Sequence, residues 1–436
     1  MDGCDDAKWM SFVKQLHKYD DVGGASPMFS VEDGESLLGE CAFRPSYEEA
    51  RELFRSSAAT AGFSLESIVI YSDGKGRDYT TDVAILRGDP KRVLLHISGV
   101  HGVEGYAGSA SQITALQYFA LRNTTRRALY EAEGAEAPTV VLVHILNPFG
   151  MSHNRRVNED NIDVNRNFLS NEQLETVRSR NPNFAGYVDV EFLLNPTYQI
   201  GTAMGPYGMW LSDLHGLLKV AYAVGAVGIE SIKRSLVAGN YYKSSGLGFG
   251  GFSRSRSVEA LSRIATDLNI DEASKVVLID VHTGLGLPGI DTLVYFSGSR
   301  LAQFEKLFPK ELSADGTTVV GGRKENGKGE GEGAAMSGYD LTVGTTDDFC
   351  REAMSPHLPE EDRVCVTQEF GTVPTVRVGK ALMDENYGFL HGTETERIEY
   401  GRRLRACFFV ETTPWARAVA HRGLQVLLQA FDSLVI

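Results

Sequence analysis

The chain has 436 residues and a formal net charge of −14, with 42% hydrophobic and 23% charged residues. This length and composition are typical of an ordinary globular protein that can bury a large core. The acidic balance, without any concentrated stripe of Lys and Arg, argues against a nucleic-acid partner. No apolar run approaches the roughly 20 residues that a membrane span needs, so we expect no membrane partner.

The cysteines are few, scattered and odd in number, and they lack C-x-x-C spacing: Cys4, Cys41, Cys350, Cys365 and Cys407. This pattern indicates reduced thiols rather than a disulfide framework. The N-terminus, MDGCDDAKWM, is acidic and lacks the basic-then-apolar order of a signal peptide. We therefore expect a cytoplasmic protein.

The first half of the chain predicts a helix, three strands, a second helix and a fourth strand. Residues 46–61 (SYEEARELFRSSAATA) have apolar side chains at helical spacing behind a Pro-Ser pair that can start a helix. The strand-like runs are 64–71, 82–86, 92–97 and 139–146, with the second helix predicted over 106–127. The order strand, helix, strand is typical of a parallel α/β sheet with right-handed crossovers.

The second half adds three strand-like runs, 275–281, 292–296 and 363–370, and a closing helix over 416–434. Together the runs predict an α/β fold, in which helices flank a mixed, largely parallel and twisted sheet.

We expect a single domain over residues 1–436, because no repeat or shift in composition marks a boundary. Residues 1–60 are predicted to be an N-terminal extension, and residues 170–260 an insert with helical patterns around 210–224. Residues 321–333 (GGRKENGKGEGEG) cannot bury much apolar surface, so we expect a mobile loop there.

Four polar clusters follow predicted strands. His101 and Glu104 follow RVLLHI, residues 147–168 follow TVVLVHIL, His282 follows KVVLIDV, and Glu369 ends RVCVTQEF. Ligands of open α/β sheets bind outside the carboxyl ends of the strands. An isolated H-x-x-E match arises readily by chance, so the repetition is more informative than any one motif.

His101, Glu104 and His282 form a His₂Glu set, which supplies three zinc ligands and leaves a fourth position for water. Catalytic zinc sites have this pattern, whereas structural zinc sites usually have four protein ligands. Asp280, two residues before His282, is expected on the same side of the strand, where it can orient the imidazole. The alternative is that each His is a satisfied interior or loop histidine.

Glu369 lies in TQEFGT, a carboxylate at a strand end followed by a glycine. A zinc hydrolase needs a base that takes a proton from the attacking water and returns it to the leaving amine, and Glu369 suits this role. The alternative is a carboxylate in a structural salt bridge.

The segment 147–168 (NPFGMSHNRRVNEDNIDVNRNF) concentrates hydrogen-bond donors without hydrophobic periodicity: Arg155, Arg156, Asn165 and Arg166. Arginine forks match carboxylates, and a guanidinium beside a scissile carbonyl can stabilise the developing oxyanion. The alternative is a solvated loop.

Four motifs, HGVEG, NPFG…RRVNEDNIDVNRNF, DVHTGLG and EFGT, occur in this order between His101 and Thr372. The chain thereby resembles the zinc carboxypeptidases of the carboxypeptidase A superfamily. The likeness is strongest to the branch with the DUF2817 domain, near the succinylglutamate desuccinylases and aspartoacylases. The resemblance implies one zinc ion on His101, Glu104 and His282, with Glu369 as general base and proton shuttle.

The resemblance also implies substrate-binding residues. Asn165 and Arg166 would bind the terminal carboxylate of the substrate, and Arg156 or its neighbour Arg155 would polarise the scissile carbonyl. Better-known carboxypeptidases use a mobile tyrosine between the third metal ligand and the glutamate. Tyr339 lies in that interval, although no matching motif surrounds it.

The implied function is zinc-dependent hydrolysis of an amide or peptide bond next to a substrate carboxylate. The expected partner is a small molecule or peptide with a free carboxylate. Two alternatives stay open: an N-acyl amino acid deacylase or amidase acting on small molecules, and a zinc-binding protein without turnover. The sequence leaves the oligomeric state undetermined.

Overall fold

An eight-stranded sheet forms the centre of the computed structural model, which describes residues 42–133, 136–197, 206–295, 304, 307–308, 318–320 and 341–435. The strand order is β1-β2-β4-β3-β5-β8-β6-β7. Four neighbouring pairs are parallel and three are antiparallel. This mixed sheet confirms the predicted fold class. The strands are β1 (Ser64–Ser72), β2 (Asp78–Leu86), β3 (Asp89–Ser98), β4 (Pro138–His144), β5 (Lys275–Pro288), β6 (Asp291–Tyr295), β7 (Thr318–Val320) and β8 (Arg363–Gly371).

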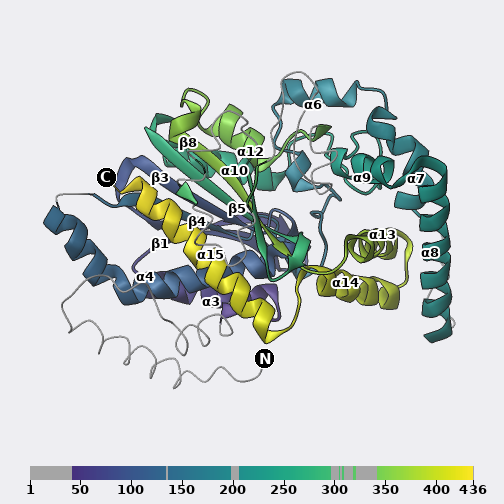
Figure 1. The fold of residues 1–436 in the computed structure, drawn as a ribbon, viewed down its shortest axis with the longest axis horizontal. Helices are drawn as coiled ribbons and strands as arrows, with labels where there is room; N and C mark the ends of the chain where they lie inside the picture. The colour runs from purple at the N-terminus through teal and green to yellow at the C-terminus, as the bar shows by residue number, and fades with distance from the viewer. Residues whose placement is uncertain are drawn as a thin grey trace.

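Helices cover both faces of the sheet (Figure 1). One face packs against α3 (Tyr47–Thr60), α4 (Gly105–Glu133) and α15 (Thr413–Leu434), and the other against α10 (Arg256–Asp267). A further hydrophobic cluster joins four helices beside the sheet: α7 (Tyr187–Leu194), α8 (Pro206–Val227), α13 (Thr375–His391) and α14 (Glu394–Phe408). The other α-helices within the described residues are α5 (Pro148–Ser152), α6 (Asn171–Arg178), α9 (Ile229–Ala238) and the short α12 (Thr346–Asp348).

Local sequence explains the elements that were predicted well. All seven residues of β4 are buried, as expected for a central strand that is covered by helices on both faces. Helix α3 starts where the Ser46 side chain accepts a hydrogen bond from the Glu49 backbone N–H, and it buries Tyr47 and Phe54 against the sheet. This helix therefore belongs to the core, although it lies within the predicted N-terminal extension.

Strand β5 is longer than predicted. The apolar run ends at Val281, but pairing with β8 continues through His282, which is the register partner of Glu369. His282 therefore lies inside the strand instead of after it. In a parallel pair, register partners point to the same face of the sheet, so the strand itself brings this imidazole and this carboxylate together.

The prediction of reduced thiols is wrong for Cys350 and Cys365, which form a disulfide. Cys350 lies in a π-helical turn, η9 (Phe349–Met354), that packs against β8, where Cys365 lies. Fifteen residues separate the two cysteines, and only this packing pairs them. Cys407 is a buried free thiol, whereas Cys4 and Cys41 lie outside the described residues. The cytoplasmic location stays a prediction.

Several sequence predictions concern parts of the chain that the structure does not describe. The loop 321–333, Tyr339 and residues 1–41 all lie outside the described residues. Among the helices in the described ranges, none combines the length and apolarity needed to cross a membrane.

Candidate active site

His101 and Glu104 are positioned by a tight turn at the carboxyl end of β3. His101 caps a 3₁₀ turn, η1 (Gly102–Glu104), which places the two side chains one turn apart. Gly102 lets this turn lie against the backbone of Gly150, because a Cβ at Gly102 would stand 2.2 Å from the Gly150 carbonyl carbon. His282 enters from β5, the strand beside β3.

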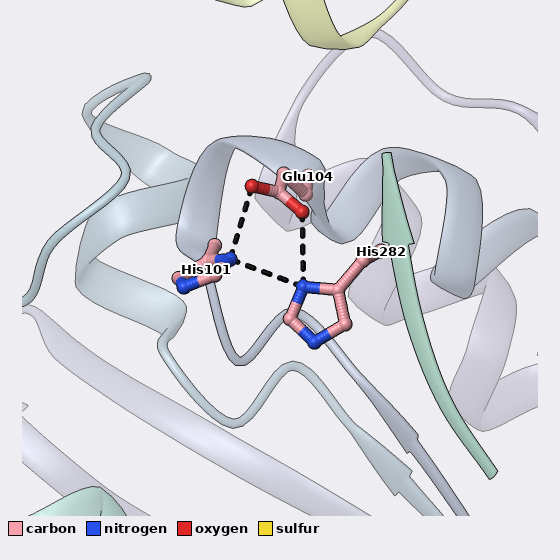
Figure 2. A group of neighbouring side chains, drawn as sticks. All are labelled: His101, Glu104 and His282. Carbon is pink, nitrogen blue, oxygen red and sulfur yellow. Dashed lines mark hydrogen bonds and ion pairs between the residues drawn. The ribbon is translucent and has the colours of Figure 1, made fainter. Parts of the chain in front are cut away.

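The three side chains point toward one another (Figure 2). The His101 Nδ1 atom is 3.0 Å from Glu104 Oε1, and the His282 Nδ1 atom is 3.1 Å from Glu104 Oε2. The two Nδ1 atoms are 3.0 Å apart. All three residues are buried, with at most 3% of their surface exposed. Two imidazoles and one carboxylate at this spacing can hold one metal ion.

Carboxylates hold both imidazoles through the Nε2 atoms, on the side that faces away from the cluster. The His101 Nε2 atom is 3.0 Å from Asp163 Oδ1, and the His282 Nε2 atom is 2.7 Å from Asp280 Oδ2. An ionised carboxylate only accepts hydrogen bonds, so each carboxylate orients Nε2 as a donor and turns Nδ1, the atom on which a metal ion would replace a proton, toward the centre of the cluster. Metal-ligating histidines are commonly held in this way.

The electrostatics of the cluster favour positive charge. Burial opposes ionisation of Glu104, but His101, His282 and Arg156 hold the pKa of this carboxyl well below its usual value. Burial likewise acts to lower the pKa of His282, yet Asp280 and Glu104 raise it well above its usual value. The surrounding carboxylates therefore stabilise a cation at this position, which suits a divalent metal ion.

Glu369 lies on β8 beside His282 and shares its cavity. The Leu285 backbone N–H donates to Glu369 Oε1 at 3.1 Å, which holds the carboxyl in place. Burial, and then the negative charge of Glu104, raise the pKa of Glu369 to about 8. A carboxyl with a pKa in this range can both accept and return a proton near neutral pH.

One cavity of about 430 Å³ brings most of the predicted site residues together. The predicted residues that line it are His101, Glu104, Arg156, Asn165, Arg166, His282 and Glu369. Arg155 is not among them. It is completely buried, donates to Glu385 Oε1 at 2.6 Å and lies 3.5 Å from the ring centre of Phe389. The ion pair with Glu385 and the contact with the Phe389 ring hold the Arg155 side chain in the protein interior.

Arg156 and Arg166 have different surroundings within the cavity. Arg156 donates to Glu104 Oε1 at 2.8 Å and to Asp163 Oδ2 at 3.2 Å. Arg166 donates to two neutral carbonyl oxygens, those of Val237 and Asn165, at 2.8 and 2.7 Å. In the described part of the chain no carboxylate forms a salt bridge with Arg166, so this guanidinium can bind an anionic ligand.

Sequence reasoning missed two residues that support the site. Asp163 lies two residues before Asn165. Its position as an acidic residue among the Arg and Asn side chains of the segment 147–168 is the sequence feature that could have identified it. Thr346 donates its backbone N–H to Asn165 Oδ1 at 3.1 Å and its hydroxyl to Asp280 Oδ2 at 2.6 Å. Nothing in the local sequence marks Thr346, because 181 residues separate it from Asn165.

Several solved structures show distant likeness to the chain. Thrombin activatable fibrinolysis inhibitor is 12% identical, with 92% of this chain and 81% of that one covered and a TM-score of 0.42. A metallo-carboxypeptidase from Burkholderia cenocepacia is 14% identical, with 86% and 68% covered and a TM-score of 0.35. One from Pseudomonas aeruginosa, in complex with (2-guanidinoethylmercapto)succinic acid, is 14% identical, with 86% and 69% covered and a TM-score of 0.37.

No curated protein matches the chain in sequence. A family model described as "Protein of unknown function (DUF2817)" matches residues 43–422, which is most of the chain. This agrees with the branch that the four sequence motifs indicated. The chain belongs to the DUF2817 family.

Proposed function

We propose that the chain is a zinc-dependent hydrolase that cleaves an amide or peptide bond next to a substrate carboxylate. One observation carries the proposal: the His101, Glu104 and His282 donors converge in a cavity that Glu369 and Arg166 also line. The cavity thus combines a candidate metal site, a proton acceptor and a candidate anion site.

One zinc ion would be held by His101 Nδ1, His282 Nδ1 and the Glu104 carboxylate. The donor set fits zinc, because all three groups are buried and both imidazoles are oriented by carboxylates. When bound there, zinc supplies Lewis-acid chemistry, lowering the pKa of a water molecule and polarising a carbonyl group.

Glu369 acts as the proton shuttle in this proposal. Its carboxylate accepts a proton from the water that attacks the scissile carbonyl carbon. The same carboxyl then donates that proton to the leaving nitrogen as the C–N bond breaks, so the residue returns to its starting state. Its raised pKa, about 8, suits both halves of this cycle.

Two donor groups recognise the substrate on either side of the scissile bond. Arg156, which already contacts Glu104, stabilises the negative charge that develops on the carbonyl oxygen. Arg166 and Asn165 bind the substrate carboxylate. Because Asn165 Oδ1 accepts the Thr346 N–H, the amide Nδ2 donors are left for the ligand. The proposal assigns this role to Arg156 instead of Arg155, because Arg155 pairs with Glu385 and is not among the residues that line the cavity.

A second candidate is an N-acyl amino acid deacylase or amidase acting on small molecules. The predicted insert, residues 170–260, favours it, because five of its residues line the cavity: Lys233, Leu236, Val237, Leu247 and Gly248. Walls built from an insert restrict the length of the substrate on that side. Comparing hydrolysis of blocked dipeptides with that of acetyl- and succinyl-amino acids separates the two candidates.

Metal analysis of the purified chain, combined with that hydrolysis panel, tests the proposal. We expect one zinc ion per chain, and hydrolysis only of substrates that carry a free carboxylate next to the scissile bond. A chain that binds zinc tightly but hydrolyses nothing across the panel would instead be a binding protein without turnover.

A further inference from the structure

Helix α8 (Pro206–Val227) lies at the edge of the molecule, where it forms the outermost element on the right of Figure 1. One side of the helix faces the protein: Ala223 is completely buried, and a Cβ at Gly216 would stand 3.0 Å from the Lys380 side chain of α13. The opposite side faces solvent.

That solvent-facing side is apolar. Six large side chains on it are between 41% and 77% exposed, and we call them the outer face of α8: Tyr207, Trp210, Leu214, Leu217, Leu218 and Tyr222. At 100° per residue these positions fall within one arc of the helix, and no charged residue shares that arc.

The charged residues of α8 lie away from the outer face. Asp213 pairs with Lys380 at 3.0 Å and with Arg403 at 3.3 Å, both on neighbouring helices. Lys219 lies four residues before the buried Ala223, on the side of the helix that faces the protein. A helix at the surface of a monomer normally has the reverse arrangement, with its apolar stripe toward the core.

The exposed apolar area is close to what one partner buries in a standard protein interface. A Tyr or Trp side chain presents about 150–250 Å² when fully exposed, so at the observed exposures the six side chains offer on the order of 700 Å². The largest apolar patch on a typical monomer is about 300–600 Å². A standard interface buries about 800 Å² on each partner, so this face alone nearly meets that requirement.

The spacing along α8 suits another helix as the partner. Apolar residues recur in alternating steps of three and four, at Tyr207, Trp210, Leu214, Leu217, Ala221 and Val224. This is the spacing of a seam that packs knobs into holes against a facing helix. The outer face, which carries no charge, can also pack against the same face of a second copy, since two copies related by a two-fold axis bring no like charges together.

We propose that the outer face of α8 is the interface through which two copies of this chain form a homodimer. The α8 helix of one copy packs against that of the other about a two-fold axis. The charge of the chain argues against a lipid surface as the occupant, because the net charge of −14 repels anionic membranes and α8 carries a single lysine.

Sedimentation velocity of the full chain over a wide range of concentrations tests the proposal. We expect a species with twice the mass of one chain, which dissociates on dilution. Leu218→Glu places a charge on the outer face beside the seam and should raise the dimer dissociation constant at least about 30-fold. Ile398→Glu is the matched control, because Ile398 on α14 is 62% exposed, as is Leu218, and lies outside the outer face. It should leave the dissociation constant unchanged.

Thermal unfolding and circular dichroism of both variants establish that any loss of dimer is not loss of fold. Trp210→Glu provides a second substitution on the outer face, at a position within the seam. The proposal is overturned if the wild-type chain is monomeric at every concentration. A monomeric chain that co-sediments with vesicles of neutral lipid would show that the outer face of α8 binds lipid instead of a second copy. The proposal is also overturned if Leu218→Glu dimerises as tightly as Ile398→Glu.

Discussion

The hydroxyl of Thr346 donates a hydrogen bond to Asp280 Oδ2 at 2.6 Å, and the same oxygen accepts from His282 Nε2 at 2.7 Å. Thr346 thereby helps to hold the carboxylate that orients a candidate metal ligand. Its backbone N–H separately donates to Asn165 Oδ1 at 3.1 Å. One residue of α12 thus supports both the metal cluster and the proposed carboxylate-binding residue, by different atoms.

Thr346→Val should weaken zinc binding without changing substrate recognition. The substitution removes the hydroxyl but keeps the backbone N–H that contacts Asn165. Loss of a group bonded directly to a metal ligand typically costs about 10–100-fold in metal affinity, and Thr346 acts one hydrogen bond further out, so the zinc dissociation constant should rise by the lower end of that range, about 10-fold. Competition with a chromophoric chelator measures it. Thr346→Ser keeps the hydroxyl and should restore wild-type affinity, whereas an unchanged constant in Thr346→Val would rule out this role.

Glu369→Gln should abolish turnover and leave the metal in place. Glutamine has nearly the same shape but cannot take a proton from water, and general-base catalysis is worth about 10²–10⁴-fold in rate. Steady-state kcat together with zinc content per chain checks the prediction. Wild-type turnover in this variant would show that another group is the base.

His101→Ala should lose zinc, because the cluster keeps only two of its three protein ligands. Metal content after dialysis, measured by mass spectrometry, gives the result. His391→Ala serves as the control, since His391 is an exposed histidine at the end of α13. Equal zinc in both variants would contradict the ligand assignment.

Arg166→Ala should impair binding of substrates through their carboxylate. A hydrogen bond to a charged group contributes about 1.5–3 kcal/mol, so KM should rise by roughly 10–100-fold. The same substrates with the carboxylate amidated should be cleaved equally poorly by the wild type and the variant. Arg178→Ala, at a half-exposed arginine of α6, is the control. If Arg166→Ala leaves KM unchanged for substrates with a free carboxylate, Arg166 does not bind that group.

His144 should make the fold less stable in acid. Burial lowers the pKa of His144 to about 3, and its ring stacks on Phe54 at 4.2 Å between centres. In the unfolded chain a histidine titrates near pH 6.5, so between these values only the unfolded state takes up the proton. The free energy of unfolding therefore falls as the pH decreases, by about 1.4 kcal/mol per pH unit from this residue.

Urea unfolding of the wild type and of His144→Gln at a series of pH values isolates this contribution, because the other titrating groups are common to both. The wild type should lose stability more steeply below about pH 6. Parallel curves for the two proteins would show that His144 is not held neutral by the fold.

Local sequence was sufficient to predict the central elements and the three side chains of the candidate metal cluster. The buried runs that became β3, β4, β5 and β8 are long, apolar and β-branched, and such runs form strands in most surroundings. His101, Glu104, His282 and Glu369 follow or end these runs. Since β3, β5 and β8 are parallel neighbours, their carboxyl ends meet at one edge of the sheet.

Contacts between segments that are far apart in the sequence decided the surroundings of the two adjacent arginines and the pairing of the cysteines. Arg155 and Arg156 are adjacent and chemically identical, but packing gives one to Glu385 in the core and the other to Glu104 in the cavity. The Cys350–Cys365 disulfide has no sequence signature, because it depends on how η9 packs on β8.

The sequence by itself determined most of the strands, the order of the motifs and the donor atoms, since these depend on residue type and local periodicity. Only the tertiary structure decided that Asp163 holds the His101 imidazole, that Thr346 supports Asp280, and that α8 turns its apolar side to solvent. These relationships depend on side-chain directions set by long-range packing, which local periodicity does not record.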